Sequence, residues 1–89
     1  IKQMAAKYKV DEKELLDVAK CESNFVPTAI GDKGNARGIF QFWRGTFNAF
    51  MKEAKFDFDY NNWKHQTELA AWAFSKGYQK HWTCYNIFK

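Results

Sequence analysis

The chain has 89 residues, of which 46% are hydrophobic and 19% aromatic, so it can form one hydrophobic core but not two, and we expect a single domain over residues 1–89. The formal net charge of +4 favours acidic partners such as nucleic acid, anionic lipid or the bacterial cell wall,, but the basic residues are scattered, which argues against nucleic acid. No apolar run approaches the roughly 20 residues that a membrane-spanning helix needs, which excludes such a span.

The first part of the chain has sequence patterns that are typical of α-helices. Apolar residues at helical spacing predict a first, short helix over residues 1–8,. Asp11, with Glu14 three residues on, forms a variant of the capping box, in which a side-chain oxygen accepts hydrogen bonds from the free N–H groups of a helix start,. This pattern predicts a second helix that begins after Asp11 and ends at about Cys21 or Glu22.

The second predicted helix carries an acidic residue on its apolar face. Leu15, Val18 and Ala19 follow the i, i+3, i+4 spacing of a buried stripe, and the i+7 position of that stripe is Glu22,. A carboxyl group among apolar neighbours loses solvation when it ionises, so its pKa rises toward the range useful for donating a proton. The alternative is that Glu22 stands at a frayed helix end and reaches solvent, as most glutamates do.

A region without helical signals follows. Pro27 disfavours helical geometry at Val26, which ends the helix before that residue. Residues 28–37 are rich in turn-forming residues and predict a loop or a small β-hairpin,. In the apolar and aromatic segment 39–43, Gln41 is the polar exception, so this side chain either faces a polar site or has a buried hydrogen-bond partner,.

Two further helices are predicted in the second half of the chain. Residues 46–55 carry an apolar stripe at helical spacing,. Asn61 or Asn62 would cap a helix that continues through Lys76, with Gly77 as its stop. The sequence therefore predicts a mostly α domain with a short loop or β-hairpin insert.

The two cysteines, Cys21 and Cys84, are far apart in the sequence and do not resemble the close CxxC pairs of zinc or redox sites,. We expect a disulfide that anchors the aromatic tail, residues 78–89. Closing so long a loop would stabilise the fold by about 4 kcal/mol in the chain-entropy model. A disulfide would place the domain outside the reducing cytosol. Two unrelated buried thiols are the alternative.

Two sequence blocks resemble those of a known enzyme family. Residues 22–29, Glu-Ser-Asn-Phe-Val-Pro-Thr-Ala, are similar to the signature of the soluble lytic transglycosylases and goose-type lysozymes, in which Glu-Ser is followed by an aromatic residue, Pro and Ala. Residues 38–42, Gly-Ile-Phe-Gln-Phe, resemble the family's Gly-Leu-Met-Gln-Ile segment, and Thr46 matches the Thr that follows it. The family's later Ala-Tyr-Asn-Ala-Gly block has no counterpart here, which leaves lyase and hydrolase chemistry both open.

The resemblance implies a small lysozyme-like helical fold and a groove for peptidoglycan glycan strands. It implies that Glu22 is the catalytic acid and base, and that Ser23, Gln41 and Thr46 bind the substrate. The implied enzyme is a peptidoglycan lytic transglycosylase that cleaves the β-1,4 bond between N-acetylmuramic acid and N-acetylglucosamine and leaves 1,6-anhydro ends. It needs neither a cofactor nor a second carboxylate.

Two alternatives use the same fold. A muramidase would hydrolyse the same bond, commonly with a second carboxylate that positions water or stabilises charge, and Asp32 is the candidate for that role. Because Asp beside Gly is an ordinary turn former, a structural role for Asp32 is the competing interpretation. A non-catalytic peptidoglycan-binding module is the second alternative, and it leaves the carboxylate of Glu22 on an apolar face unexplained.

Aromatic side chains are abundant for so small a chain. Sugar rings present an apolar C–H surface that stacks on aromatic rings, so Trp43 and Tyr78, together with Trp82, are candidate subsite residues. The alternative is that these rings fill an undersized core. His65 and His81 have no partners at metal-ligand spacing, so we expect structural or surface histidines and no metal.

The sequence also gives expectations about where the domain acts, whether it is part of a longer protein, and its oligomeric state. The resemblance and the expected disulfide both indicate an extracytoplasmic location, which could be the periplasm, the cell wall or the exterior. The chain begins at Ile1 and carries no leader pattern, so we expect a mature or excised piece of a longer protein. We expect it to act as a monomer.

Overall fold

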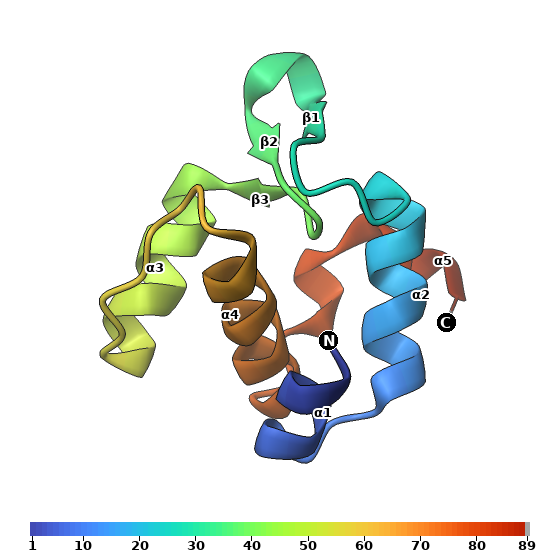
Figure 1. Cartoon of the computed structure of the whole chain (residues 1–89), viewed down its shortest axis with the longest axis vertical. Coiled ribbons are helices and arrows are strands. Elements are labelled where there is room, and N and C mark those ends of the chain that lie inside the picture. The colour runs from blue at the N-terminus through green and yellow to red at the C-terminus, as the bar shows by residue number, and fades with distance from the viewer. Residues whose placement is uncertain (89) are drawn as a thin grey trace.

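Helices form most of this computed structural model, which describes residues 1–88 (Figure 1). Within those residues the α-helices are α1 (Lys2–Tyr8), α2 (Glu12–Ser23), α3 (Arg44–Ala54), α4 (Trp63–Ser75) and α5 (Thr83–Phe88). Short 3-10 helices are η1 (Asp32–Gly34) and η2 (Gln79–His81), and the strands are β1 (Ile30–Gly31), β2 (Ala36–Arg37) and β3 (Phe42–Trp43). The predicted mostly α fold with a small β insert is confirmed.

The start of α2 follows the predicted cap. The Asp11 carboxylate accepts hydrogen bonds from the backbone N–H groups of Lys13 and Glu14, at 2.8 and 3.4 Å, which satisfies donors that a helix start leaves free. The helix runs to Ser23, slightly beyond its predicted end. Asn24 then takes the left-handed conformation, with φ 53°, that commonly ends a helix,.

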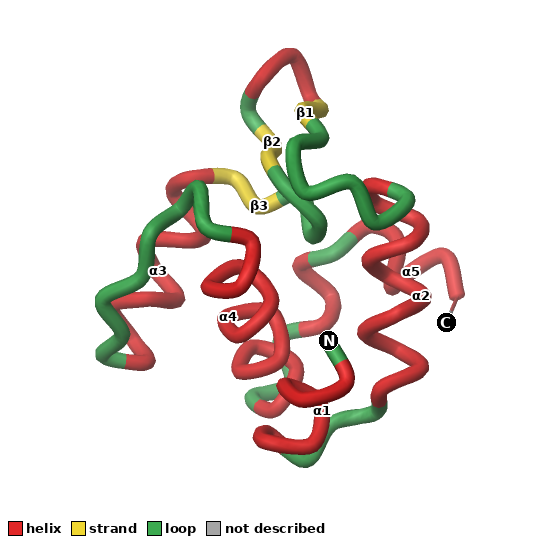
Figure 2. The backbone as a smooth tube through the Cα atoms, viewed as in Figure 1, coloured by secondary structure: helices red, strands yellow, loops and turns green. Residues whose placement is uncertain are grey.

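Helix α4 is the central element of the core. Asn62, one of the two predicted caps, accepts hydrogen bonds from the N–H groups of Lys64 and His65. The helix packs against α1 and α3, and Figure 2 shows it between those two elements. A helix buried on nearly every side occupies the centre of a core, and the buried residues of α4 are Gln66, Thr67, Leu69, Ala70, Ala71, Trp72, Ala73 and Phe74.

An aromatic cluster joins the core to the C-terminal segment. Phe42 lies edge-to-face against Phe47, with ring centroids 5.4 Å apart, and against Trp82 at the same separation. Edge-to-face pairs of this kind stabilise a fold beyond the area that they bury. The Trp82 ring is buried, and its Nε1–H donates to the carbonyl oxygen of Phe40 at 3.0 Å. For Trp82, therefore, the ring serves mainly as core.

The β insert is a hairpin extended by a third short strand. Strand β1 pairs antiparallel with β2, placing Ile30 opposite Arg37, and β2 pairs antiparallel with β3, placing Ala36 opposite Trp43. The hairpin projects from the helical body at the top of Figure 1, above the end of α2. The turn at its tip contains η1.

The C-terminal segment differs from the prediction, which gave it no helix. It forms η2 and α5, and α5 packs against α2. The expected disulfide is present between Cys21 of α2 and Cys84 of α5, with the two Cα atoms 5.9 Å apart. Lys89, the last residue of the predicted tail, lies outside the described residues. None of the helices in residues 1–88 has the length and apolar character needed to cross a membrane.

Candidate active site

Four segments that are distant in the sequence converge on one small cleft of about 80 Å³. The end of α2, the hairpin tip, the β3–α3 junction and the segment before α5 each contribute side chains. The lining residues are Glu22, Asp32, Gln41, Phe42, Trp43, Thr46, His81, Trp82 and Thr83. The cleft therefore combines two carboxylates with aromatic walls.

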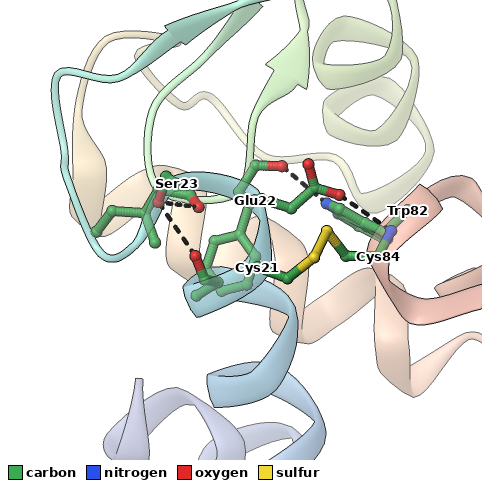
Figure 3. Close-up of a disulfide and its surroundings, with 8 residues drawn as sticks. Cys21, Glu22, Ser23, Trp82 and Cys84 are labelled. Atoms are coloured by element: carbon green, nitrogen blue, oxygen red, sulfur yellow. Dashed lines mark hydrogen bonds between the residues drawn. A yellow bond between two sulfur atoms is a disulfide. The ribbon is translucent and has the colours of Figure 1, made fainter. Parts of the chain in front are cut away.

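Glu22 stands in the last turn of α2 and is half-buried. Its Oε2 accepts a hydrogen bond from the backbone N–H of Cys84 at 3.4 Å (Figure 3). Figure 3 also shows the Trp82 ring next to the carboxyl group. The apolar stripe of α2 thus places the carboxyl group against an aromatic wall, and the start of α5 orients it.

The environment favours the protonated form of Glu22. Burial, the largest influence, raises the pKa of this carboxyl group above its ordinary value of 4.5, because an ionised group is poorly solvated there. The Cys84 N–H acts in the opposite direction and lowers the pKa, while the negative charge of Asp32 raises it further. The net result is a raised pKa, and this is the direction of shift that suits a carboxyl group that donates a proton,.

Asp32 enters the same cleft from the hairpin tip. It belongs to η1, and its Oδ2 accepts a hydrogen bond from Nε1–H of Trp43 at 3.2 Å. Asp32 also stands in a tight turn, as its φ of 49° shows. The turn role and the cleft role expected as alternatives are thus compatible in this structure.

Gln41 and Thr46 both line the cleft. The Gln41 Nε2 donates to the carbonyl oxygens of Ala29 and Gly38, at 3.1 and 2.8 Å. Its Oε1 lies so close to Gly31 that a Cβ there would overlap it. The sequence analysis expected Gln41 either to face a polar site or to have a hydrogen-bond partner. The structure shows both, because Gln41 lines the cleft and its amide group bonds to two backbone carbonyl groups.

Two of the predicted groove residues do not line this cleft. The Ser23 hydroxyl donates to the carbonyl oxygen of Ile39 at 2.7 Å and so ties α2 to the segment before β3 (Figure 3). The Tyr78 hydroxyl donates to Glu53 at 2.7 Å, and its ring stacks on Phe50. Both side chains support the surrounding fold in this structure.

The structure adds two cleft residues that the sequence analysis did not assign to the site. His81 and Thr83 line the cleft on either side of Trp82. No local pattern marks them, because their position depends on how the C-terminal segment folds back onto α2. His65 lies elsewhere, where its Nδ1 accepts the backbone N–H of Asp59. Among residues 1–88, no group of three or more His, Cys, Asp or Glu side chains is arranged to hold a metal ion.

Comparison with known protein families identifies a related family. The family described as "Transglycosylase SLT domain" matches residues 1–85. This range includes every residue that lines the cleft. No curated protein and no solved structure gave a significant match to the chain.

Proposed function

The chain belongs to the transglycosylase SLT domain family, part of the lysozyme-like superfamily, and from this premise we propose that Glu22 is its catalytic acid and base. Domains of this family act on peptidoglycan outside the cytoplasm, with lytic transglycosylase-type activity. The proposed target is the β-1,4 bond between N-acetylmuramic acid and N-acetylglucosamine.

The observation that carries the proposal is the setting of Glu22. A glutamate at a frayed helix end would be solvated and would have an ordinary pKa. Glu22 instead is half-buried in a cleft, against the Trp82 ring, and has a raised pKa. Perturbed carboxyl groups in clefts are typical of general acids.

In the proposed reaction, protonated Glu22 donates its proton to the glycosidic oxygen, and the bond to C1 of the muramic acid breaks. The positive charge that develops at C1 is oxocarbenium-like. The ionised Glu22 then removes a proton from the 6-hydroxyl of the same sugar, and that oxygen bonds to C1. The product is a 1,6-anhydro ring, no water is consumed, and Glu22 is protonated again.

A second candidate function is supported by Asp32. Its carboxylate lines the cleft of Glu22 and is held by Trp43. In a muramidase, Asp32 would position the attacking water or stabilise the charge at C1, and the product would have a reducing end. Lyase and hydrolase thus differ in the end of the released glycan.

Mass spectrometry of fragments released from purified peptidoglycan tests both candidates. We expect anhydro ends from the wild type and none from Glu22→Gln. A matched control is Glu12→Gln, which neutralises a carboxylate on the same helix outside the cleft. Reducing ends that are lost in the variant would favour the muramidase. Release by Glu22→Gln at the wild-type rate would overturn the catalytic role, and no release by any form would indicate a binding module.

We also propose that the catalytic unit is a single domain that acts as a monomer in the periplasm, the cell wall or the exterior. A disulfide is typical of oxidising compartments, which supports the extracytoplasmic location,. The molecular mass of the purified domain, measured by analytical ultracentrifugation, tests this proposal, and we expect the mass of one chain. Activity that rises more steeply than protein concentration would contradict it.

A further inference from the structure

A second, larger hollow adjoins the cleft. It has a volume of about 450 Å³, and we call it the arginine hollow. Its lining includes Arg37 of β2, Arg44 at the start of α3, Tyr60 and Asn61. Trp43 lines both this hollow and the cleft, so one exposed indole separates the proposed catalytic carboxyl group from a basic surface.

The two guanidinium groups are held in place without an acidic partner. The Arg44 guanidinium lies over the Tyr60 ring, with its Cζ 4.5 Å from the ring centroid. The Arg37 Nε–H donates to the carbonyl oxygen of Gly34 at 3.3 Å, which leaves its terminal N–H groups unused by that bond. Neither arginine forms an ion pair with any acidic residue in the described range, and no acidic residue lines the hollow.

Such a pair is suited to carboxylates. A guanidinium presents a planar fork of donors that binds a carboxylate through two parallel hydrogen bonds. Here Tyr60 supports the fork of Arg44 by a cation–π contact, which limits the freedom that binding would otherwise remove,. Gly45, in the first turn of α3, also lines the hollow, and the start of a helix adds to the positive potential.

The volume of the arginine hollow indicates that its ligand is larger than a single carboxylate group. Sites for whole ligands typically measure about 300 to 1,000 Å³, whereas one isolated carboxylate would fill little of this space. In peptidoglycan the lactyl group of muramic acid is joined to a stem peptide through an amide, and the free carboxylates stand on the peptide. A stem peptide therefore offers both the bulk and the charge that the hollow fits.

We propose that the arginine hollow binds the carboxylates of the stem peptide on a muramic acid residue of a glycan strand seated in the cleft, an inference that rests on the function proposed above. Arg37 and Arg44 form the ion pairs, and Trp43 lies between the sugar and the peptide. The domain then recognises peptide-bearing, acidic glycan in preference to glycan whose peptide is amidated or absent.

Calorimetric binding to Glu22→Gln tests this without turnover. The probes are a GlcNAc–MurNAc tetrasaccharide with the dipeptide L-Ala–D-Glu on each muramic acid, the same compound with its carboxylates amidated, and the bare tetrasaccharide with free lactyl carboxylates. We expect the acidic peptide form to bind at least about tenfold more tightly than the other two, since a charge-assisted hydrogen bond typically contributes that factor. Arg37→Gln with Arg44→Gln, added to Glu22→Gln, removes this preference.

The control is Lys52→Gln with Lys76→Gln in the Glu22→Gln protein, which removes the same charge at exposed sites outside the hollow. An equal loss in this control would reduce the effect to net charge and overturn the proposal. Equal binding of the amidated probe, or tightest binding of the bare tetrasaccharide, would also overturn it. Thermal unfolding of the arginine variant verifies that it is folded.

The two proposals fail separately. If the wild type releases no fragments but Glu22→Gln binds the acidic peptide probe most tightly, the catalytic role of Glu22 is refuted and the proposed binding of the stem peptide in the arginine hollow is supported. If the wild type cleaves peptidoglycan but the three probes bind with equal affinity, the proposed peptidoglycan cleavage is supported and the proposed binding of the stem peptide in the arginine hollow is refuted.

Discussion

The backbone N–H of Cys84 donates to the Glu22 carboxylate, and the sulfur of Cys84 is bonded to Cys21, the residue immediately before Glu22. One residue of α5 is thus fixed to α2 both by a covalent bond and by a hydrogen bond at adjacent positions. The disulfide therefore holds the donor that orients the proposed catalytic group.

Removal of the disulfide, by Cys21→Ser with Cys84→Ser, is expected to lower both stability and activity. The bond closes a loop with a sequence separation of 63, for which the chain-entropy model gives about 4 kcal/mol. For a domain of this size, Tm should fall by on the order of 20 °C. At temperatures where the variant is folded, kcat should still fall, because the Cys84 N–H is no longer held beside Glu22.

Thermal unfolding with and without reductant checks this expectation. Reductant should lower the Tm of the wild type and leave that of the double variant unchanged. A double variant as stable as the oxidised wild type would contradict it.

The pH dependence of kcat/KM should reflect the raised pKa of Glu22. Because the acid form donates the proton, activity should decline as pH rises through that pKa. Asp32→Asn removes a negative charge that raises the pKa of Glu22, so the alkaline limb should move to lower pH. The control, Asp57→Asn, removes an exposed carboxylate outside the cleft. If the alkaline limb of the pH profile stays at the same pH in Asp32→Asn, the charge of Asp32 does not influence the pKa of Glu22.

Glu22→Gln should be more stable than the wild type at pH 7. The folded state raises the pKa of Glu22 above 4.5, so folding favours the protonated carboxyl group. Its contribution to stability is complete below pH 4.5 and is lost as pH rises through the folded-state pKa. Glutamine does not titrate and avoids this loss, so the difference in Tm should shrink toward pH 4. A variant less stable than the wild type at pH 7 would refute this account.

Gly38→Ala should destabilise the fold more than Gly34→Ala. Both glycines have a positive φ, 87° and 93°, a conformation that costs other residues about 1 to 2 kcal/mol. A Cβ at Gly38 would in addition overlap the buried Gln66 side chain, whereas nothing lies within 4 Å of one at Gly34. We expect about 3 kcal/mol for Gly38→Ala, measured by urea unfolding. Equal losses in the two variants would show that the overlap is relieved.

Local signals predicted the helices well. The caps at Asp11 and Asn62 act within a few residues of themselves, and the apolar stripes repeat with the helix period, so both can be read from the sequence. Helix ends shifted by one or two residues, since fraying and the following turn decide them. Helix α5 was missed because it is short and packs on α2 across the length of the chain.

The cleft was predictable only where one segment defines it. The stripe on α2 indicated the partly buried position of Glu22 from the sequence alone. The contribution of His81 was missed because it depends on tertiary folding of a distant segment. Ser23 and Tyr78 came from the family resemblance and from general stacking preferences. Neither source specifies that their hydroxyl groups bond to Ile39 and Glu53 in this chain.

The disulfide has one more consequence, which concerns integrity under proteolysis. All nine residues that line the cleft lie between Cys21 and Cys84 in the sequence, inside the covalent ring that the bond closes. A protease that cuts the exposed hairpin at Lys33 would nick this ring without dividing the molecule. The two fragments would remain joined, with Glu22 and Trp82 on linked pieces, and they would separate on a gel only after reduction.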